Sequence, residues 1–270
     1  MEKIRFSYSR LTTYLDCPLK YYYKYHTDVI ALPATLPLFF GTSIHAALEQ
    51  NDIYRKDKGI DRERTELKHI FRTKFLEELK KNPAEVKRLN EFAKKEEITL
   101  FQETVDMGEK MIDAYLDHAF IKSDKFVPEH MEKEFDLELS SAPVRIYGFV
   151  DIVTKDGIII DRKTSKNKYP EETAFEKKIQ LVMYTIWYRK THNKKEKRTE
   201  YHVLVKNKKP YLQIVPVDVS EYEIQKTIEL IKETQNNILA KKFPPKPGWM
   251  CNYCDFKSVC TVHNTDALTI

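Results

Sequence analysis

The sequence predicts an α/β fold in which helices flank a central mixed sheet. Three successive stretches, residues 131–139, 144–153 and 157–164, alternate apolar and polar side chains with the period of two that strands show. Helical patterns precede and follow them, and an order of helix, three strands, helix, strands and helix builds α/β layers. The chain has 270 residues, 41% of them apolar, which is enough for a large core.

The N-terminal stretch of residues 6–18 predicts a Ser or Thr cap followed by a short helix that stops near Pro18. Residues 20–26 are rich in tyrosine and basic side chains. Aromatic side chains at this spacing pack in a core more often than they stack on nucleobases, so packing is the favoured interpretation.

A second helix is expected to begin at Thr42 or Ser43, after a proline-marked loop, and to carry His45 in its first turns. A single helical histidine is more often structural than a ligand. Residues 61–120 follow a helical pattern broken at Pro83, and we expect residues 50–125 to form an inserted helical lobe without a chemical motif.

The stretch of residues 157–164 is an apolar strand that ends in reactive side chains. Alternation places Asp161 and Lys163 on one face and Arg162 on the other. A two-residue hairpin connection to the strand of residues 144–153 should bring Asp151 close to Asp161 and Lys163. Two carboxylates beside a lysine form a hard-oxygen pocket for a divalent ion such as Mg²⁺, with a cation to orient water or to stabilise developing charge.

The second half of the chain adds one helix from Pro170, strands at 201–205 and 211–217, and a long helix over 221–240. On the first of these helices, Gln180 and Tyr184 are four residues apart and therefore share a face. Eight lysines and arginines fall between residues 190 and 209. They predict either a solvated surface or a phosphate-tracking groove, and the net charge of +5 does not decide between the two.

The four cysteines form the last motif. Three lie close together as Cys251, Cys254 and Cys260, and the fourth is Cys17. No stretch resembles a signal peptide or reaches membrane-spanning length, so we expect a soluble intracellular protein whose cysteines are metal ligands rather than disulfides. Residues 241–270 would then close onto Cys17, and four thiolates suit either tetrahedral zinc, the commoner structural ion, or an iron–sulfur cube.

These motifs, in this order, resemble the PD-(D/E)XK nucleases of the RecB type that carry an iron–sulfur cluster. That group includes the AddB nuclease domain and the CRISPR-associated RecB-like exonucleases. The resemblance covers nearly the whole chain as a single nuclease domain, residues 1–270. It rests on residues 9–18, 41–45, 148–151, 160–164 and 180–184 and on the closing cysteines.

The resemblance implies a restriction-endonuclease-like core and assigns roles to the motif residues. His45, Asp151 and Asp161 would bind Mg²⁺ or Mn²⁺, with Lys163 working beside them and Gln180 and Tyr184 lining the site. It also implies that a [4Fe–4S] cluster, rather than zinc, is held by Cys17, Cys251, Cys254 and Cys260. Many members carry Glu where this chain has Asp161, and either carboxylate serves a hard cation.

The resulting hypothesis is a metal-dependent DNA nuclease, an exonuclease acting on single-stranded or frayed DNA ends in recombination, repair or CRISPR adaptation. The first alternative is a DNA-binding or assembly subunit for a helicase or integrase partner, with little nuclease activity of its own. The second is a zinc-stapled module without catalysis. Convergence of two carboxylates and a lysine favours the enzyme, because a platform has no need of that set.

Overall fold

The computed structural model describes residues 4–29, 31, 35–83, 87, 97–139, 144–170 and 175–262. The chain divides into two compact units. Unit 1 comprises Met1–Pro33, Phe135–Gly148 and Ser220–Ile270, and unit 2 comprises Ala34–Glu134 and Phe149–Val219. No helix within the described residues is long and apolar enough to cross a membrane.

The strands confirm the predicted mixed sheet. In unit 2, β3 and β4 are antiparallel with Ile152 opposite Ile160, β4 and β5 are parallel, and β5 and β6 are antiparallel. The strand order is β1-β3-β4-β5-β6, with β2 also paired to β3. The bounds are β2 (Pro128–Leu139), β3 (Val144–Thr154), β4 (Ile158–Ser165), β5 (Arg198–Val205) and β6 (Tyr211–Val217).

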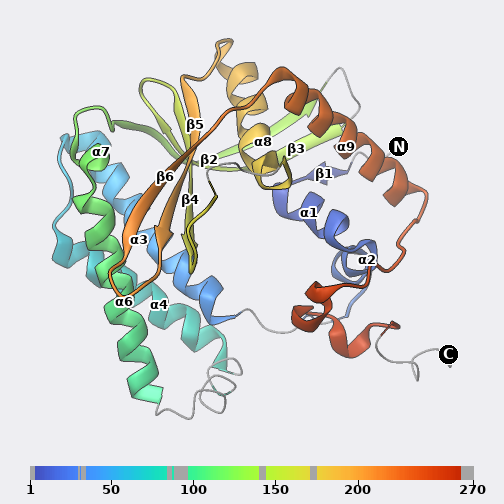
Figure 1. Ribbon diagram of the computed structural model, residues 1–270, viewed down its shortest axis with the longest axis horizontal. Helices are drawn as coiled ribbons and strands as arrows, with labels where there is room; N and C mark the ends of the chain where they lie inside the picture. The colour runs from blue at the N-terminus through green and yellow to red at the C-terminus, as the bar shows by residue number, and fades with distance from the viewer. Residues whose placement is uncertain are drawn as a thin grey trace. The chain divides into compact units, whose positions relative to one another are not determined.

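Helices cover both faces of the unit 2 strands. Figure 1 shows α3, α4 and α6 on one side of β4 to β6 and α8 on the other. The first group buries Phe40, Phe71 and Ile112 in one apolar cluster with Ile158 and Ile160 of β4. The helices are α3 (Leu36–Lys58), α4 (Arg64–Lys81), α6 (Glu97–Asp117), α7 (Ala119–Lys122) and α8 (Phe175–His192).

The predicted start of the second helix at Thr42 or Ser43 is wrong. Helix α3 already begins at Leu36, with Thr35 as its N-cap and Pro37 in the first turn, where a missing backbone N–H costs nothing. Gly41 is therefore a helix-interior residue, and its lack of a side chain has a packing reason. A Cβ there would lie 3.1 Å from Oγ1 of Thr164, so the helix passes close to the end of β4.

Unit 1 joins the two ends of the chain. Its elements are β1 (Arg5–Phe6), α1 (Tyr8–Asp16), α2 (Pro18–His26), α9 (Glu221–Leu239), η1 (Trp249–Tyr253), η2 (Lys257–Val259) and the adjoining parts of β2 and β3. The Ser7 Oγ caps α1 by accepting from the Arg10 backbone N–H at 3.1 Å, which confirms the predicted cap. The Tyr14 hydroxyl donates to the Lys242 carbonyl at 2.7 Å, and Lys20 pairs with Asp255 at 3.1 Å.

The structure differs from the sequence-based expectation in its shortest strand and in two helix starts. Strand β1 was not predicted, because two residues are too few for an alternation to be recognised; it pairs in parallel with the start of β3. The predicted acidic helix start at residues 171–172 lies outside the described residues, and within them α8 begins at Phe175. Helix α2 was also not predicted: the sequence pattern was expected to stop near Pro18, but this proline lies in the first turn of α2. The other long helices and the strands lie within a few residues of the predicted ranges, including α9, whose capping box joins Ser220 and Glu223.

Candidate active site

The reactive side chains of unit 2 gather where β3 and β4 run side by side. Continuing the Ile152–Ile160 register by one residue places Asp151 opposite Asp161. The Asp151 Oδ2 accepts a hydrogen bond from the Arg162 backbone N–H at 2.7 Å, which holds the carboxylate against the edge of β4. The expected proximity of Asp151 to Asp161 and Lys163 is therefore present, and the hairpin between the strands sets it.

Four side chains close a hydrogen-bonded ring on the face of β4 that α8 covers. The Lys163 ammonium lies 2.7 Å from the Asp161 Oδ2 and donates to the Gln180 Oε1 at 2.8 Å. The Gln180 Nε2 donates to the Tyr184 hydroxyl at 2.7 Å, and that hydroxyl donates to the Asp161 Oδ1 at 3.4 Å. Gln180 and Tyr184 share a helix face because they are one turn apart. The ring fixes the position of the Lys163 ammonium from two sides.

A second group of side chains adjoins this ring. His45 on α3 places its Nδ1 3.7 Å from the Asp151 Oδ2. Glu132 on β2 joins them, so that one ligand atom from each of the three residues lies within 4.8 Å of the others. This trio offers one imidazole nitrogen and two carboxylate oxygens, a donor set suited to Mn²⁺ or Mg²⁺. Asp161, the third predicted ligand, lies beside the trio with its carboxylate already bound to Lys163 and Tyr184.

Glu132 was not singled out from the sequence. It belongs to a run of alternating acidic residues that predicts a solvent-facing side of a strand. In the structure its backbone adopts a left-handed conformation, with φ of 43°, which interrupts the regular strand geometry as a bulge does. A non-glycine residue with positive φ inside a strand is uncommon and marks positions that carry strain for a reason. No pattern of residue types announces such a backbone change.

Several carboxyl groups of this site have raised pKa values, chiefly because they are buried and in part because they lie close together. Burial, followed by repulsion from Asp151, raises the pKa of Glu132 to about 7. Burial also raises the pKa of Asp161 to about 6, with the Asp151 charge adding to the rise against the attraction of Lys163, and burial raises the pKa values of Asp151 and Glu49. A bound cation would stabilise the ionised form of these carboxylates, so the site favours cation binding.

The histidine and the lysine are in the protonation states that such a site needs. Burial lowers the pKa of His45 to about 4, with the Arg162 charge contributing, so the imidazole is neutral near pH 7 and its nitrogens can act as ligands. Burial opposes the charged form of Lys163, yet the Asp161 and Asp151 carboxylates outweigh it and raise the lysine pKa above its usual value. Lys163 is therefore a permanent ammonium.

The opposite face of β4 anchors the site to the helices. Arg162, between the two reactive residues, is 4% exposed and pairs with the fully buried Asp52 of α3 at 2.5 Å. It also donates to the Tyr115 hydroxyl of α6 at 2.7 Å. Breaking a buried ion pair on one side leaves an uncompensated charge, which typically costs about 3–5 kcal/mol. This pair therefore holds the strand segment that carries Asp161 and Lys163 in place.

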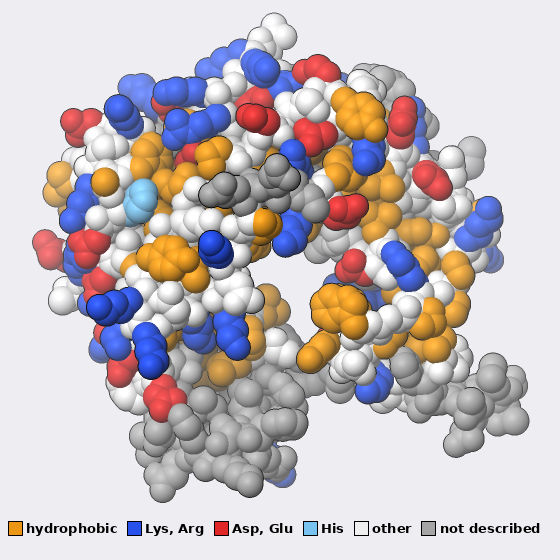
Figure 2. All heavy atoms as spheres, in the orientation of Figure 1, with side chains coloured by type: hydrophobic (Ala, Val, Ile, Leu, Met, Phe, Trp, Pro, Cys, Tyr) orange, Lys and Arg blue, Asp and Glu red, His pale blue; other side chains and the backbone are white. Residues whose placement is uncertain are grey.

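The basic stretch of residues 190–209 has both structural and exposed members. Lys197 pairs with Asp156, and the Lys206 ammonium lies 4.7 Å from the Phe40 ring centroid, where burial lowers its pKa. Lys194 and Lys195 are exposed in the turn after α8. Figure 2 shows Lys and Arg side chains gathered around that end of α8.

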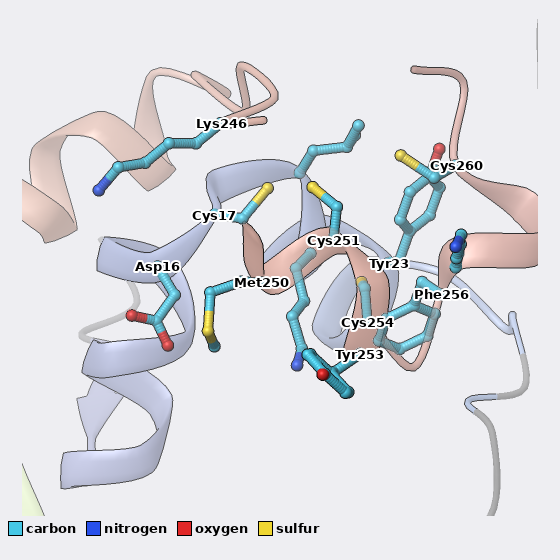
Figure 3. Close-up of a pocket in the computed structure, with 13 residues that line it drawn as sticks. Asp16, Cys17, Tyr23, Lys246, Met250, Cys251, Tyr253, Cys254, Phe256 and Cys260 are labelled. Atoms are coloured by element: carbon cyan, nitrogen blue, oxygen red, sulfur yellow. The ribbon is translucent and has the colours of Figure 1, made fainter. Parts of the chain in front are cut away.

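All four cysteines line one cavity of unit 1 (Figure 3). Cys17 lies between α1 and α2, and the C-terminal three lie in and after the short η1 and η2 helices. The four are free thiols, so no disulfide competes for them. The Gly248 N–H donates to the Cys251 Sγ at 3.4 Å, the kind of outer-shell contact that orients a thiolate ligand. The donor set fits a four-thiolate metal centre.

The predicted site residues fall into two separate groups, one in unit 2 and one in unit 1. His45 and Asp151 lie together with Glu132, and Asp161, Lys163, Gln180 and Tyr184 form the adjoining ring. Cys17 lies with Cys251, Cys254 and Cys260 in a separate cavity of unit 1. His263, three residues after Cys260 and the nearest candidate for a fourth ligand in place of Cys17, lies outside the described residues.

A comparison with known protein families identifies the family of this chain. Residues 5–261 match the profile of the PD-(D/E)XK nuclease superfamily. A solved structure of a candidate exonuclease from Eubacterium rectale shares 14% identity, covers 92% of this chain and 86% of its own, and superposes with a TM-score of 0.54. The solved structure of SSO0001 shares 15% identity over 91% of this chain and 95% of its own, but its TM-score of 0.35 is too low to carry an argument. No curated protein matches the chain.

Proposed function

We propose that this chain, which belongs to the PD-(D/E)XK nuclease superfamily, is a metal-dependent deoxyribonuclease that removes nucleotides from DNA ends by phosphodiester hydrolysis. One observation carries the proposal: the Lys163 ammonium is held by Asp161 and Gln180 beside the trio of His45, Asp151 and Glu132. A cation and a hard-ligand cluster converge there on one rigid pair of strands.

The residues that would hold a divalent ion are His45, Asp151 and Glu132, with Asp161 adjacent. They fit Mg²⁺ or Mn²⁺ because their donor atoms converge and because burial, joined at Glu132 by the Asp151 charge, raises the pKa values of both carboxyl groups. When bound, such an ion supplies an activated water nucleophile and charge stabilisation at the phosphate.

The protein side chains position the reaction. Lys163 carries a fixed positive charge that can bind a non-bridging phosphate oxygen or orient a water molecule. Gln180 and Tyr184 hold that charge at one place, since each donates or accepts within the closed ring. A preorganised donor of this kind typically contributes about 100-fold or more to the rate.

An action on DNA ends is a proposal with two supports. The sequence motifs resemble those of RecB-type exonucleases, and the solved structure from Eubacterium rectale that shares the fold is itself a candidate exonuclease. The DNA-binding or assembly subunit is the rival function. It is less favoured because the ring and the trio are both complete, whereas a platform has no use for a desolvated carboxylate pair beside a lysine.

The four cysteines are proposed to hold a [4Fe–4S] cluster. Their convergence in one cavity supports a metal centre, and the resemblance to iron–sulfur RecB-type nucleases favours iron over zinc. When bound, the cluster supplies a covalent crosslink between distant parts of the chain, and the hard-ligand site in unit 2 contains no redox group that would use its electrons. Iron, sulfide and zinc content of the purified protein decide between the two metals.

The test of the nuclease function uses linear and circular substrates. Wild-type protein with Mg²⁺ or Mn²⁺ should shorten end-labelled linear single- and double-stranded DNA and leave closed circles intact. Lys163→Ala should lose about 100-fold or more of the rate, while Lys166→Ala, which removes an exposed lysine three residues further on, should not. If the protein cuts closed circles as fast as linear DNA, the activity is that of an endonuclease and not of an exonuclease. Folded protein that cuts no substrate would favour the assembly subunit.

A further inference from the structure

A second cavity, with a volume of about 660 Å³, lies in unit 1. Its wall comes from the start of β1, from α1 and α2, and from the end of α9 with the residues that follow it. Its polar and aromatic members are Arg5, Arg10, Tyr22, His26, Lys241 and Phe243, and aliphatic side chains complete it. The volume lies within the range of about 300–1,000 Å³ that small-molecule sites occupy.

Positive charge dominates this cavity. Among the described residues that line it there is no carboxylate. The Arg10 guanidinium donates to the Tyr21 hydroxyl at 3.0 Å and to the Arg5 carbonyl at 3.3 Å, both neutral acceptors, so its charge has no anionic partner within the described parts of the chain. Arg5 pairs with Asp136, but Asp136 is shared with Arg145. Two guanidinium groups therefore share one carboxylate, and a net positive charge remains.

The Arg10 guanidinium and the Lys241 ammonium, which both line the cavity, are held differently. Arg10 is fixed by its hydrogen bonds and by the Tyr25 ring, whose centroid lies 4.9 Å from the guanidinium carbon. Lys241 follows α9 with a left-handed backbone, φ of 54°, and its ammonium makes no ion pair with any residue that the structure describes. A guanidinium held by hydrogen bonds and an unpaired ammonium lining the same cavity are a combination suited to a phosphate group.

Aromatic rings form another part of the wall. Tyr22 and His26, one helical turn apart on α2, stack with an interplanar angle of 10°, and the Phe243 ring centroid lies 5.2 Å from both of theirs. Tyr22 remains 37% exposed, although Tyr21 next to it is fully buried. Helix α2 therefore has tyrosines in two environments: Tyr21 packs in the core, while the ring of Tyr22 lines the cavity.

We infer that this cavity binds a nucleotide of single-stranded DNA, with its phosphate at Arg10 and Lys241 and its base against the rings of Tyr22, His26 and Phe243. Grooves that hold single strands without sequence preference combine these two elements, a cationic track for the backbone and aromatic faces for the bases. The inference rests on the proposed function in one respect, which is that the bound polymer is DNA. The residues belong to unit 1 and are distinct from the trio and the ring of unit 2.

The test measures binding without cleavage. Affinity for a labelled oligo(dT) six nucleotides long is measured by fluorescence anisotropy in chelator over a series of salt concentrations. Lys241→Asn removes the ammonium and keeps a residue that tolerates the left-handed backbone. The matched control is Lys242→Asn, which removes the same charge from the adjacent exposed lysine outside the cavity.

We expect Lys241→Asn to weaken binding about three- to tenfold and to reduce the slope of log affinity against log salt by about 0.7, the value for one lost phosphate contact on a single strand. Lys242→Asn should change neither. Tyr22→Ala should weaken binding of oligo(dT) about fivefold or more and leave an abasic oligomer unaffected, because only the former has bases to stack.

Equal effects of the two lysine substitutions would overturn the inference, as would unchanged oligo(dT) binding by Tyr22→Ala. Failure of the proposed function is distinguishable from either result. If the wild-type protein binds oligo(dT) through Lys241 and Tyr22 but hydrolyses no DNA with metal, the cavity stands and the nuclease assignment falls. If it hydrolyses DNA and the cavity variants bind oligo(dT) like the wild type, the nuclease assignment stands and the inference about the cavity falls.

Discussion

Replacing Glu132 by glutamine should stabilise the metal-free protein and weaken its response to metal. The side chain is held in a partly buried site where burial and the Asp151 charge raise its pKa from 4.5 to about 7. A shift of this size corresponds to about 3 kcal/mol against the ionised form. Because the carboxylate is partly exposed, solvent screening reduces this to about 1–2 kcal/mol. Glutamine has nearly the same shape and no charge, so it removes that unfavourable contribution.

The sign and the pH range follow from the raised pKa. Below about pH 4.5 the Glu132 carboxyl is protonated in both the folded and the unfolded chain, so the substitution should have no electrostatic effect on stability. Between about pH 4.5 and 7 the unfolded chain ionises more readily than the folded one, and wild-type stability falls relative to the variant. The full difference should be present above about pH 7.

The assay is thermal unfolding in chelator at pH 5 and pH 8, repeated with Mn²⁺. Glu132→Gln should melt about 2–5 °C above the wild type at pH 8 and close to it at pH 5. Added Mn²⁺ should raise the melting temperature of the wild type more than that of the variant, since loss of one ligand weakens binding about tenfold or more. Glu134→Gln, an exposed position two residues further along β2, is the control and should match the wild type throughout. An equal Mn²⁺ response in both proteins, or a destabilised variant at pH 8, would refute this account of Glu132.

Three further predictions concern the other parts of the two sites. Lys163→Ala should lose about 100-fold or more in cleavage rate while retaining DNA binding and the iron content of the wild type, measured on the same preparation. His45→Ala should require a higher metal concentration for half-maximal activity, with Mn²⁺ rescuing better than Mg²⁺ because imidazole suits the softer ion; an unchanged titration would make the histidine structural. Cys17→Ala should give a colourless, protease-sensitive protein, because a crosslink closing a loop of this length removes about 5 kcal/mol of unfolded-chain freedom. Full iron content and a normal melting temperature in that variant would contradict a cluster ligated by Cys17.

Much of the fold is predictable from the sequence because its elements have clear periodicity. The strand pair of β3 and β4 follows from alternation and a two-residue connection, and these local rules bring Asp151 to Asp161 and Lys163. The start of α3 was missed for a local reason as well: Pro37 reads as a loop residue, yet proline is tolerated in the first turn of a helix. Helix propensity alone does not distinguish a proline in a loop from a proline in the first turn of a helix.

The part of the site that the sequence did not predict depends on the backbone and on long-range packing. Glu132 turns toward His45 and Asp151 because its φ is positive, a change with no counterpart in residue type. The Arg162–Asp52 pair joins residues 110 positions apart, and a buried aspartate in the middle of a helix looks like any other polar residue until its partner is known. Such contacts are set by how the layers pack, which periodicity does not encode.

The division of unit 1 along the chain sets the order in which the protein can be completed. Its first segment ends at Pro33, and its last begins at Ser220 and carries the three late cysteines. During synthesis at roughly 5–20 residues per second, α1 and α2 therefore wait about 10–50 s for the partners that bury Tyr14 and pair with Lys20. Until then Cys17 has no companion thiols.

A metal centre that needs all four cysteines, as proposed above, can therefore form only after Cys260 has been synthesised. A ribosome that stops before residue 251 releases a protein with one cysteine of four, whatever the state of its unit 2 strands. The residues of the trio and the ring all lie before residue 185, so they are synthesised long before the crosslink can form. On the proposed four-cysteine ligation, a chain that stops before Cys251 lacks the crosslink to Cys17, so α1 and α2 remain without the segments that pack against them and are open to proteolysis.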